Sequence, residues 1–240
     1  MRIPMPRQSK QFSQQFNTDA DDVLHALPHG RDNHKMMLKL LLLLLLSFAG
    51  ISASNTHAAD IAAGKAKADA CIACHGSVGI SSEASIPILA AQPSLFIVYQ
   101  LIQYRGNQRV SPTMNTIAAS LSDTDMRDLG AYFSSLPAPH AATGLDAEKI
   151  KLGQTISEAN HCQVCHTPDM RGQKQVPRLA GQHVAYLNTQ LKGLRDGTRK
   201  DIDGSMASAA QGLSDADIDS VSVFAASLGA ASPRTPAPVK

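Results

Sequence analysis

The feature that most constrains this chain is a five-residue motif that occurs twice. Cys71-Ile72-Ala73-Cys74-His75 recurs as Cys162-Gln163-Val164-Cys165-His166, and the two motifs contain all four cysteines. Two segments recur after each motif: Pro-x-Leu-Ala-x-Gln at 87–92 and 177–182, and Leu-Ser-Asp at 121–123 and 213–215. Single residues recur between these segments: Gln100 matches Gln190, Arg105 matches Arg195, Arg109 matches Arg199, and Met114 matches Met206. The offset drifts from 91 to 90 to 92, which indicates a duplicated unit with small loop changes.

The duplication predicts two tandem domains, residues 59–137 and residues 147–229. Residues 138–146 between them are rich in proline and small side chains, which is typical of a linker. The tail, residues 230–240, contains three prolines and is expected to be flexible.

Each unit has the pattern of an all-α domain. Residues 62–70 are rich in Ala and Lys, and the stretch from Ser94 to Tyr104 has apolar residues at helical spacing. Ser122 and Ser214 each begin a Ser-x-x-Asp variant of the capping box, which predicts helices running to about residues 136 and 228. Strand patterns are nearly absent.

The N-terminal region predicts an export signal in an unusual place. Residues 36–58 combine flanking lysines, an apolar run of twelve residues (40–51) and a Thr-His-Ala cleavage site before Ala59. A membrane span needs about 20 apolar residues, so a cleaved signal is favoured over a membrane anchor. Residues 1–35 are polar without apolar periodicity, and we interpret them as disordered or as the result of a misplaced start codon.

Charge and aromatic content narrow the function further. Residues 59–240 hold sixteen Lys/Arg and sixteen Asp/Glu, so no basic patch for nucleic acid is expected. The same stretch has no Trp and only seven Phe or Tyr. Domains of about 90 residues are marginal in stability, so a bound group is expected to fill each core.

The doubled motif indicates covalent haem. Two thiols three positions apart lie on one side of a helical turn, where they can form thioethers to both vinyl groups of a haem. The adjacent His75 or His166 then becomes the proximal iron ligand, and Cys-x-x-Cys-His is the attachment signature of c-type haem. We therefore predict two covalently bound haem c groups, attached at Cys71, Cys74, Cys162 and Cys165.

Two other interpretations of the cysteines are weaker. A redox dithiol would need a βαβ pattern, which is missing. A four-cysteine zinc site would have to join pairs 91 residues apart in separate repeats, and would leave unexplained why a histidine follows both pairs.

The repeat also predicts the sixth iron ligands. Met114 and Met206 lie 39 and 40 residues after their histidines, in stretches that look like loops before the last helix of each unit. Met126 is paired with Ile218, which favours an apolar core position, and Met170 follows His166 too closely to reach the far face of a haem. His161 and His183 do not recur in the first unit, so we discount them as ligands.

These motifs together resemble the cytochrome c4 family of two-domain di-haem bacterial cytochromes, over about residues 59–230. The resemblance implies two class I cytochrome c folds related by a pseudo-twofold axis. It implies that Pro87 and Pro177 accept a bond from the proximal imidazoles, and that Gly64 meets Tyr132 and Gly153 meets Phe224 where first and last helices cross. With no Trp, the haem propionates must be held by Tyr, Gln, Arg or backbone groups.

The resemblance further implies a carrier that delivers electrons from a quinol-oxidising complex to a terminal oxidase or other acceptor. The export signal indicates that this carrier works in the periplasm, and we expect it to be a monomer. A peripheral association with the membrane is left open. The alternatives are the haem subunit of a larger periplasmic dehydrogenase and a di-haem peroxidase. A peroxidase needs an open iron, and the paired methionines oppose it.

Overall fold

A computed structural model describes residues 37, 39 and 58–230 of the chain. The N-terminal extension, nearly all of the signal at 36–58, and residues 231–240 of the tail lie outside the described residues, so the predictions made for them stay predictions. Between residues 58 and 230 there is no β-strand, only two isolated bridges. Within the described part of the chain, no helix is long and apolar enough to cross a membrane.

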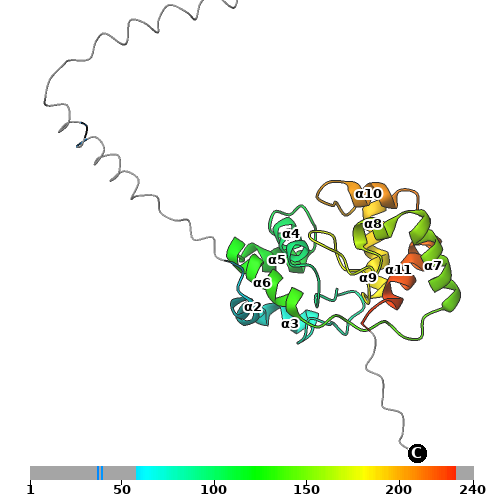
Figure 1. Cartoon of the computed structure of the whole chain (residues 1–240), viewed down its shortest axis with the longest axis horizontal. Coiled ribbons are helices and arrows are strands. Elements are labelled where there is room, and N and C mark those ends of the chain that lie inside the picture. Colours follow the sequence, from blue (N-terminus) through cyan, green and yellow to red (C-terminus); the bar gives the residue numbers. More distant parts are fainter. Residues whose placement is uncertain (1–36, 38, 40–57, 231–240) are drawn as a thin grey trace, which may run out of the picture. The chain divides into compact units, whose positions relative to one another are not determined.

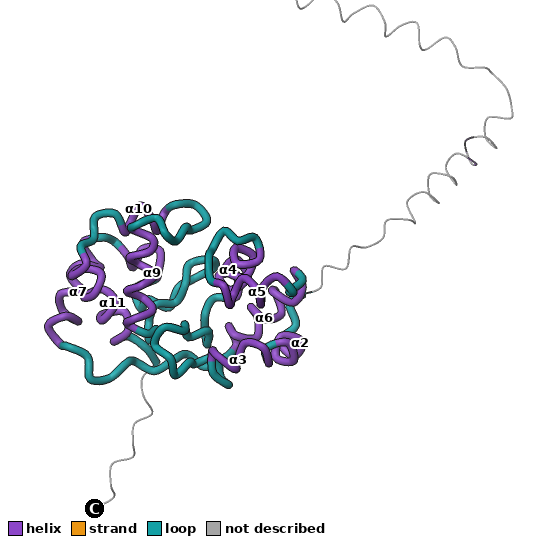
Figure 2. The backbone as a smooth tube through the Cα atoms, turned by 180° about the vertical axis from the view of Figure 1, so that it is seen from behind, coloured by secondary structure: helices purple, strands orange, loops and turns teal. Residues whose placement is uncertain are grey.

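The helices follow the sequence repeat, as Figures 1 and 2 show. The first repeat comprises α2 (Ile61–Lys67), α3 (Asp69–His75), α4 (Ser94–Arg105), α5 (Pro112–Ala119) and α6 (Asp123–Ser135). The second comprises α7 (Ala147–Ala159), α8 (Cys162–His166), α9 (Val184–Arg195), α10 (Ser205–Ala210) and α11 (Asp215–Ser227). The extensive helix–helix contacts all join helices of the same repeat, chiefly α2 and α4 to α6, and α7 and α9 to α11.

The predicted capping boxes are confirmed in both repeats. The Ser122 hydroxyl accepts from the Asp125 amide, while the Asp125 carboxylate accepts from the Ser122 amide; Ser214 and Asp217 repeat the arrangement. Reciprocal bonds of this kind satisfy backbone donors that a helix start leaves unpaired. The helices that follow end one residue before Leu136 and Leu228, as the sequence predicts.

The first and last helices of each repeat cross at a glycine, which confirms a second expectation. A Cβ on Gly64 would overlap the backbone of α6 and lie 2.9 Å from the Cβ of Tyr132. A Cβ on Gly153 would overlap the backbone of α11 and lie 2.8 Å from the Cβ of Phe224. The absence of a side chain therefore lets each helix pair approach closely.

Two local expectations were wrong. Met114 and Met206 lie in the short helices α5 and α10 rather than in loops. Ser111 caps α5, Pro112 occupies its first turn, and the Asp201 carboxylate accepts from the Met206 amide at 2.7 Å. These local signals favour a short helix over a loop at both methionines.

The segment predicted as a linker is bonded to the second repeat. The Ala142 amide donates to the Ala226 carbonyl and the Ala230 amide to the Pro139 carbonyl, each at 2.9 Å. Main-chain bonds thus tie residues 139–142 to the end of α11.

Candidate haem sites

Each Cys-x-x-Cys-His motif lies on a helix that ends at its histidine. In α3 and α8 the first cysteine is half-buried and the second exposed, and all four thiols are free of disulfides. Burial raises the pKa of the Cys71 thiol. Cys71 packs against the buried apolar cluster of the first repeat, as Leu89 and Met114 do, and Cys162 packs against that of the second repeat. The first cysteine of each motif therefore faces an apolar core and the second faces outward.

The histidines of the two motifs have similar environments. His75 Nδ1 lies 2.8 Å from the Pro87 carbonyl oxygen, and His166 Nδ1 lies 3.0 Å from that of Pro177. Both rings are buried, at 6% and 3% exposure, and loss of hydration lowers the pKa of both imidazoles. A neutral ring that donates its Nδ1 proton to a carbonyl leaves the Nε2 lone pair free for a metal.

The environment of His166 fits a haem iron. Its Nε2 atom is buried and has no hydrogen-bond partner among the residues that the structure describes. An unpaired buried polar atom costs about 1–3 kcal/mol, and an iron ligated at this atom would satisfy it. Together with the free thiols and the bond at Nδ1, this orphaned nitrogen shows that the residues present suit a covalently attached haem.

The methionines of the two repeats differ in how deeply they are buried. Met126 and Met170 are completely buried among core side chains, Met170 against Ala180 and Phe224. Met114 and Met206 are only half-buried. The assignment of these two residues as sixth ligands stays a prediction.

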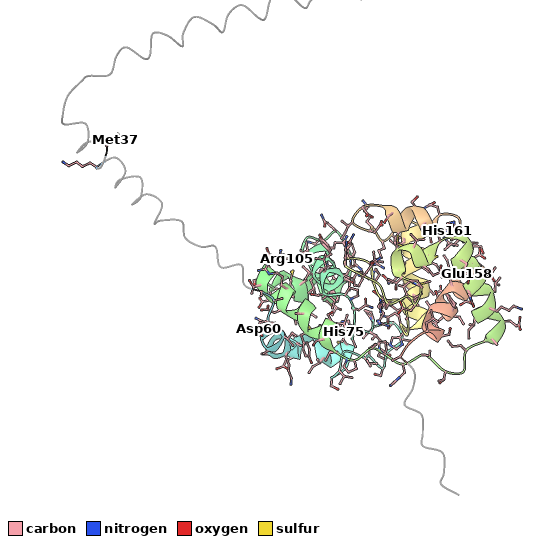
Figure 3. All side chains as sticks on the ribbon, in the orientation of Figure 1. Met37, Asp60, His75, Arg105, Glu158 and His161 are labelled. Carbon is pink, nitrogen blue, oxygen red and sulfur yellow. The ribbon has the colours of Figure 1, made fainter. Side chains whose placement is uncertain are left out.

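The competing histidines have other surroundings. His183 Nε2 lies 2.9 Å from the Ser81 hydroxyl oxygen and 3.1 Å from the Ser81 carbonyl oxygen, in the other repeat. His161 is exposed at the N-terminus of α8, with a positive φ of 54°. Figure 3 shows His161 and His75 in the two different repeats.

The recurring arginines have two distinct roles, which their spacing alone does not reveal. Arg105 donates to the Leu121 carbonyl at 3.0 Å, and Arg195 donates to the Leu213 carbonyl at 3.1 Å. Both also pair with the first aspartate of the following helix. This pair of arginines therefore fastens α4 and α9 to the turns before α6 and α11.

Arg109 and Arg199 instead meet between the repeats. Arg109 donates to Gln190 at 2.7 Å, to Tyr186 at 2.8 Å and to Gln100, while Arg199 donates to Gln100 at 3.3 Å. Arg109 is 6% exposed, and within the described part of the chain the Nε atom of Arg199 is buried without a hydrogen-bond partner. Burial, followed by the neighbouring Arg109 charge, lowers the pKa of Arg199 to about 10.

No ion pair formed by the described residues includes either of these two arginines. Buried positive charges are stable only when paired or well hydrogen-bonded. The cluster therefore has the chemistry of an anion site between the repeats.

The glutamines of the Pro-x-Leu-Ala-x-Gln segments form a second contact between the repeats. Gln182 accepts from the Ile88 amide at 2.9 Å and donates to the Ile88 carbonyl at 3.0 Å. Gln92 does the same with Arg178, at 3.0 and 2.9 Å. Because Ile88 and Arg178 occupy equivalent repeat positions, the contact obeys a local twofold symmetry. The sequence showed that these glutamines recur but not what they bind.

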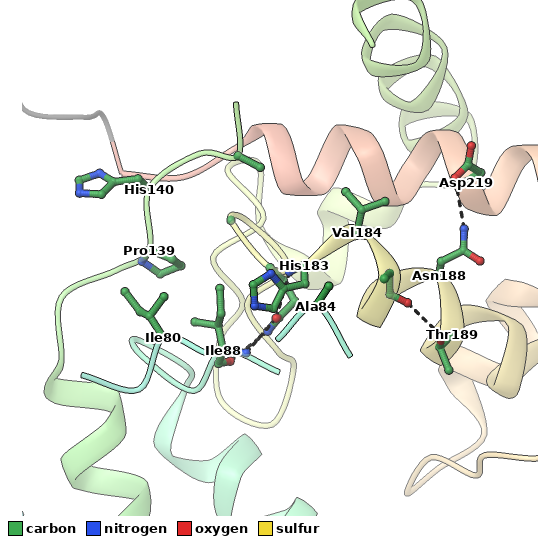
Figure 4. A pocket seen from close by; sticks show the side chains of 14 residues that line it. Ile80, Ala84, Ile88, Pro139, His140, His183, Val184, Asn188, Thr189 and Asp219 are labelled. Atoms are coloured by element: carbon green, nitrogen blue, oxygen red, sulfur yellow. Dashed lines mark hydrogen bonds between the residues drawn. The ribbon is translucent and has the colours of Figure 1, made fainter. Parts of the chain in front are cut away.

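An open cavity of about 840 Å³ lies between the loop at residues 80–88, the segment at 139–142 and α9 (Figure 4). Its walls include Ile80 and Ile88, with His140 and His183. None of the predicted haem-attachment or iron-binding residues is among those that line it.

Two helical repeats, each with a Cys-x-x-Cys-His helix whose buried histidine faces a proline carbonyl, define a di-haem c-type cytochrome. The family model for cytochrome c matches residues 150–229. Cytochrome c4 from Pseudomonas aeruginosa is 37% identical over 198 residues, a match that covers 78% of this chain and 98% of that protein. The chain belongs to the cytochrome c4 family.

Two further proteins illustrate the similarity. The solved structure of reduced recombinant cytochrome c4 from Pseudomonas stutzeri is 30% identical with a TM-score of 0.67, covering 71% of this chain and 100% of that one. The "thiosulfate dehydrogenase electron acceptor" of Stutzerimonas stutzeri is 32% identical, covering 78% of this chain and 91% of that protein.

Membership of the family settles the class of function. The chain has two tandem class I cytochrome c domains and binds two covalent haem c groups. It is an electron carrier rather than an enzyme.

Proposed function

We propose that this di-haem protein works in the periplasm and carries electrons from a respiratory quinol-oxidising complex to a terminal oxidase or another acceptor. The observation that supports this most is the equivalence of the two haem environments. Both repeats have a buried neutral histidine held by a proline carbonyl, and both have a methionine at matched spacing. Filled axial positions suit electron transfer, since they leave no place for a substrate.

The haem irons would be held by His75 with Met114 and by His166 with Met206. The four motif cysteines, Cys71, Cys74, Cys162 and Cys165, would attach the two haems covalently. A bound haem supplies an iron that changes oxidation state by one electron, and a methionine ligand raises its reduction potential. The chain keeps each imidazole neutral, fixes its orientation and excludes water from it.

The cluster between the repeats supplies candidates for the propionate site. Arg109 and Arg199 are two positive charges that pair with no carboxylate of the described residues, and the Tyr186 hydroxyl accepts a hydrogen bond from Arg109. We propose that these three residues bind haem propionates, which would neutralise the buried guanidinium charges. An anion shared between the two repeats would also favour their close approach.

The location rests on the sequence. Residues 36–58 have the pattern of an export signal, and haem is attached to Cys-x-x-Cys-His motifs outside the cytoplasm in bacteria. We expect a monomer with residues 59–137 and 147–229 as its haem domains.

A second candidate is a haem subunit that accepts electrons from one dedicated periplasmic dehydrogenase. The observation in its favour is the similarity to the electron acceptor of thiosulfate dehydrogenase in Stutzerimonas stutzeri. Both candidates use the same residues and differ only in the electron donor.

The test uses the full-length protein after export and haem attachment. The oxidised protein is mixed with membranes of its source that contain quinol, and the reduction of its haems is followed by visible absorption. The proposal predicts reduction by quinol that stops when the quinol-oxidising complex is inhibited, and reoxidation by oxygen through the membrane oxidase. Reduction only by a co-purifying dehydrogenase and its substrate would contradict the proposal and support the second candidate.

A further inference from the structure

One peptide unit in each repeat takes part in two hydrogen bonds at once. The carbonyl of Pro87 faces His75 Nδ1 at 2.8 Å. The amide of the same peptide, on Ile88, donates to the side-chain oxygen of Gln182 at 2.9 Å. The proximal histidine of the first repeat is therefore connected through a single peptide group to a glutamine of the second repeat.

The second repeat has the equivalent arrangement, related to the first by the local twofold symmetry. The carbonyl of Pro177 faces His166 Nδ1 at 3.0 Å, and the amide of that peptide, on Arg178, donates to Gln92 at 3.0 Å. Gln92 and Gln182, here called the crossed glutamines, are both 3% exposed. Each one also donates to the next carbonyl, which fixes the orientation of its amide group.

Hydrogen bonds that share a peptide group strengthen one another. When the amide N–H donates, electron density shifts toward the carbonyl oxygen, which becomes a better acceptor. A better acceptor at Nδ1 makes the imidazole a stronger electron donor through Nε2, because partners of a ligating histidine tune its basicity. A more basic axial ligand stabilises the ferric state relative to the ferrous state.

We propose that the crossed glutamines are positioning residues that set the properties of the haem in the opposite repeat. Gln182 polarises the Pro87 carbonyl and acts on the first haem, and Gln92 polarises the Pro177 carbonyl and acts on the second. Contact between the repeats is thereby coupled to the redox state of each iron. This inference rests on the proposed ligation of iron by His75 and His166.

The two contacts are not equally shielded from water. Both bonds of Gln182 to Ile88 are buried, whereas the bonds of Gln92 to Arg178 are partly accessible. Hydrogen bonds are electrostatically stronger where water is excluded. We therefore expect the effect on the first haem to exceed the effect on the second.

The test compares Gln182→Leu and Gln92→Leu with the wild type as holo-proteins. The Nδ1–H resonances of His75 and His166 are recorded by NMR in the diamagnetic ferrous state, and the reduction potential of each haem is followed by an NMR redox titration. In Gln182→Leu we expect an upfield shift and faster exchange of the His75 proton, and a more positive potential of the first haem. In Gln92→Leu we expect the same at His166 and the second haem, with smaller shifts.

Two further variants separate this effect from loosening of the interface. Gln182→Glu keeps an acceptor for the Ile88 amide and should retain the His75 resonance near its wild-type position. His183→Leu removes a contact with Ser81 of the other repeat that reaches neither proximal peptide, so both histidine resonances should stay in place. A His183→Leu variant that shifts them as Gln182→Leu does would overturn the proposal.

Shifts confined to the repeat that carries the substitution, or no shift in either leucine variant, would also overturn it. The proposed ligation is monitored separately by the near-infrared sulfur-to-iron band and by the hyperfine shifts of the ferric protein. Absence of these signals from the wild-type spectrum would refute the ligation itself. That result is distinct from a failure of each glutamine to affect the haem of the opposite repeat.

Discussion

Replacement of Gly153 by alanine tests whether the close helix crossing stabilises the fold. The new Cβ would lie 2.8 Å from the Cβ of Phe224 and would overlap the backbone at Ser220. Ordinary contacts between carbon atoms are about 3.5–4.0 Å long. Because the overlap involves backbone, a change of side-chain rotamer cannot relieve it, and α7 and α11 must separate by about 1 Å.

The expected cost follows from two opposing terms. Overpacking of this kind, which includes the dispersion energy lost when the helices separate by about 1 Å, costs about 3 kcal/mol, at the upper end of the usual range. Alanine in place of glycine stabilises a helix by about 1 kcal/mol. The net loss of unfolding free energy is therefore about 2 kcal/mol, or a fall in Tm of about 4–8 °C for a chain of this size.

The assay is thermal unfolding of the holo-protein, followed by circular dichroism at 222 nm. Gly212→Ala is the matched control, because a Cβ at that position meets nothing within 4 Å and the backbone has no positive φ. This control should change stability by no more than about 0.5 kcal/mol. A Gly153→Ala variant as stable as the wild type would refute the argument that the missing side chain permits the crossing.

Three further predictions concern the haems and the helix caps. Acid denaturation and extraction with organic solvent should leave two haems per polypeptide, and release of haem or a mass for only one would contradict the covalent attachment. A variant with serine in place of Cys71, Cys74, Cys162 and Cys165 should show little cooperative helical unfolding, because it lacks the haems that complete two small cores. Finally, bonds from Ser122 and then Lys67 lower the pKa of Asp125 to about 2, so its stabilisation is present above pH 4 and is lost as the pH falls toward 2. Thermal unfolding should therefore separate wild type from Asp125→Asn at neutral pH but not near pH 2, and an equal difference at both pH values would contradict the assignment.

Much of the fold could be predicted because its determinants are local or repeated. The caps at Ser122 and Ser214 depend on only four residues each. The crossing helix pairs and the prolines that face the motif histidines were predictable because each occurs in both repeats. The start of α5 carried an equally local signal, a serine cap followed by Pro112, which the expectation of a loop around Met114 left out of account.

The contacts between the repeats could not be predicted in this way. Arg105 and Arg109 recur equally well, yet one fastens a helix to a neighbouring turn and the other meets Gln190 across the interface. Likewise, the recurrence of Gln92 and Gln182 did not show that each binds the backbone of the opposite repeat. Such contacts join residues more than 80 positions apart, and their geometry depends on how two folded units pack.

The central claim is that both irons are closed to substrates by a histidine and a methionine. The most direct measurement is the near-infrared sulfur-to-iron charge-transfer band of the ferric protein, combined with carbon monoxide binding to the ferrous protein. Met114→Ala and Met206→Ala should each remove half of the band and let one haem per chain bind carbon monoxide.

The controls Met126→Leu and Met170→Leu change completely buried methionines and should leave the band intact. The account predicts a full band and no carbon monoxide binding in the wild type. A wild-type protein that already binds carbon monoxide at one haem would contradict it.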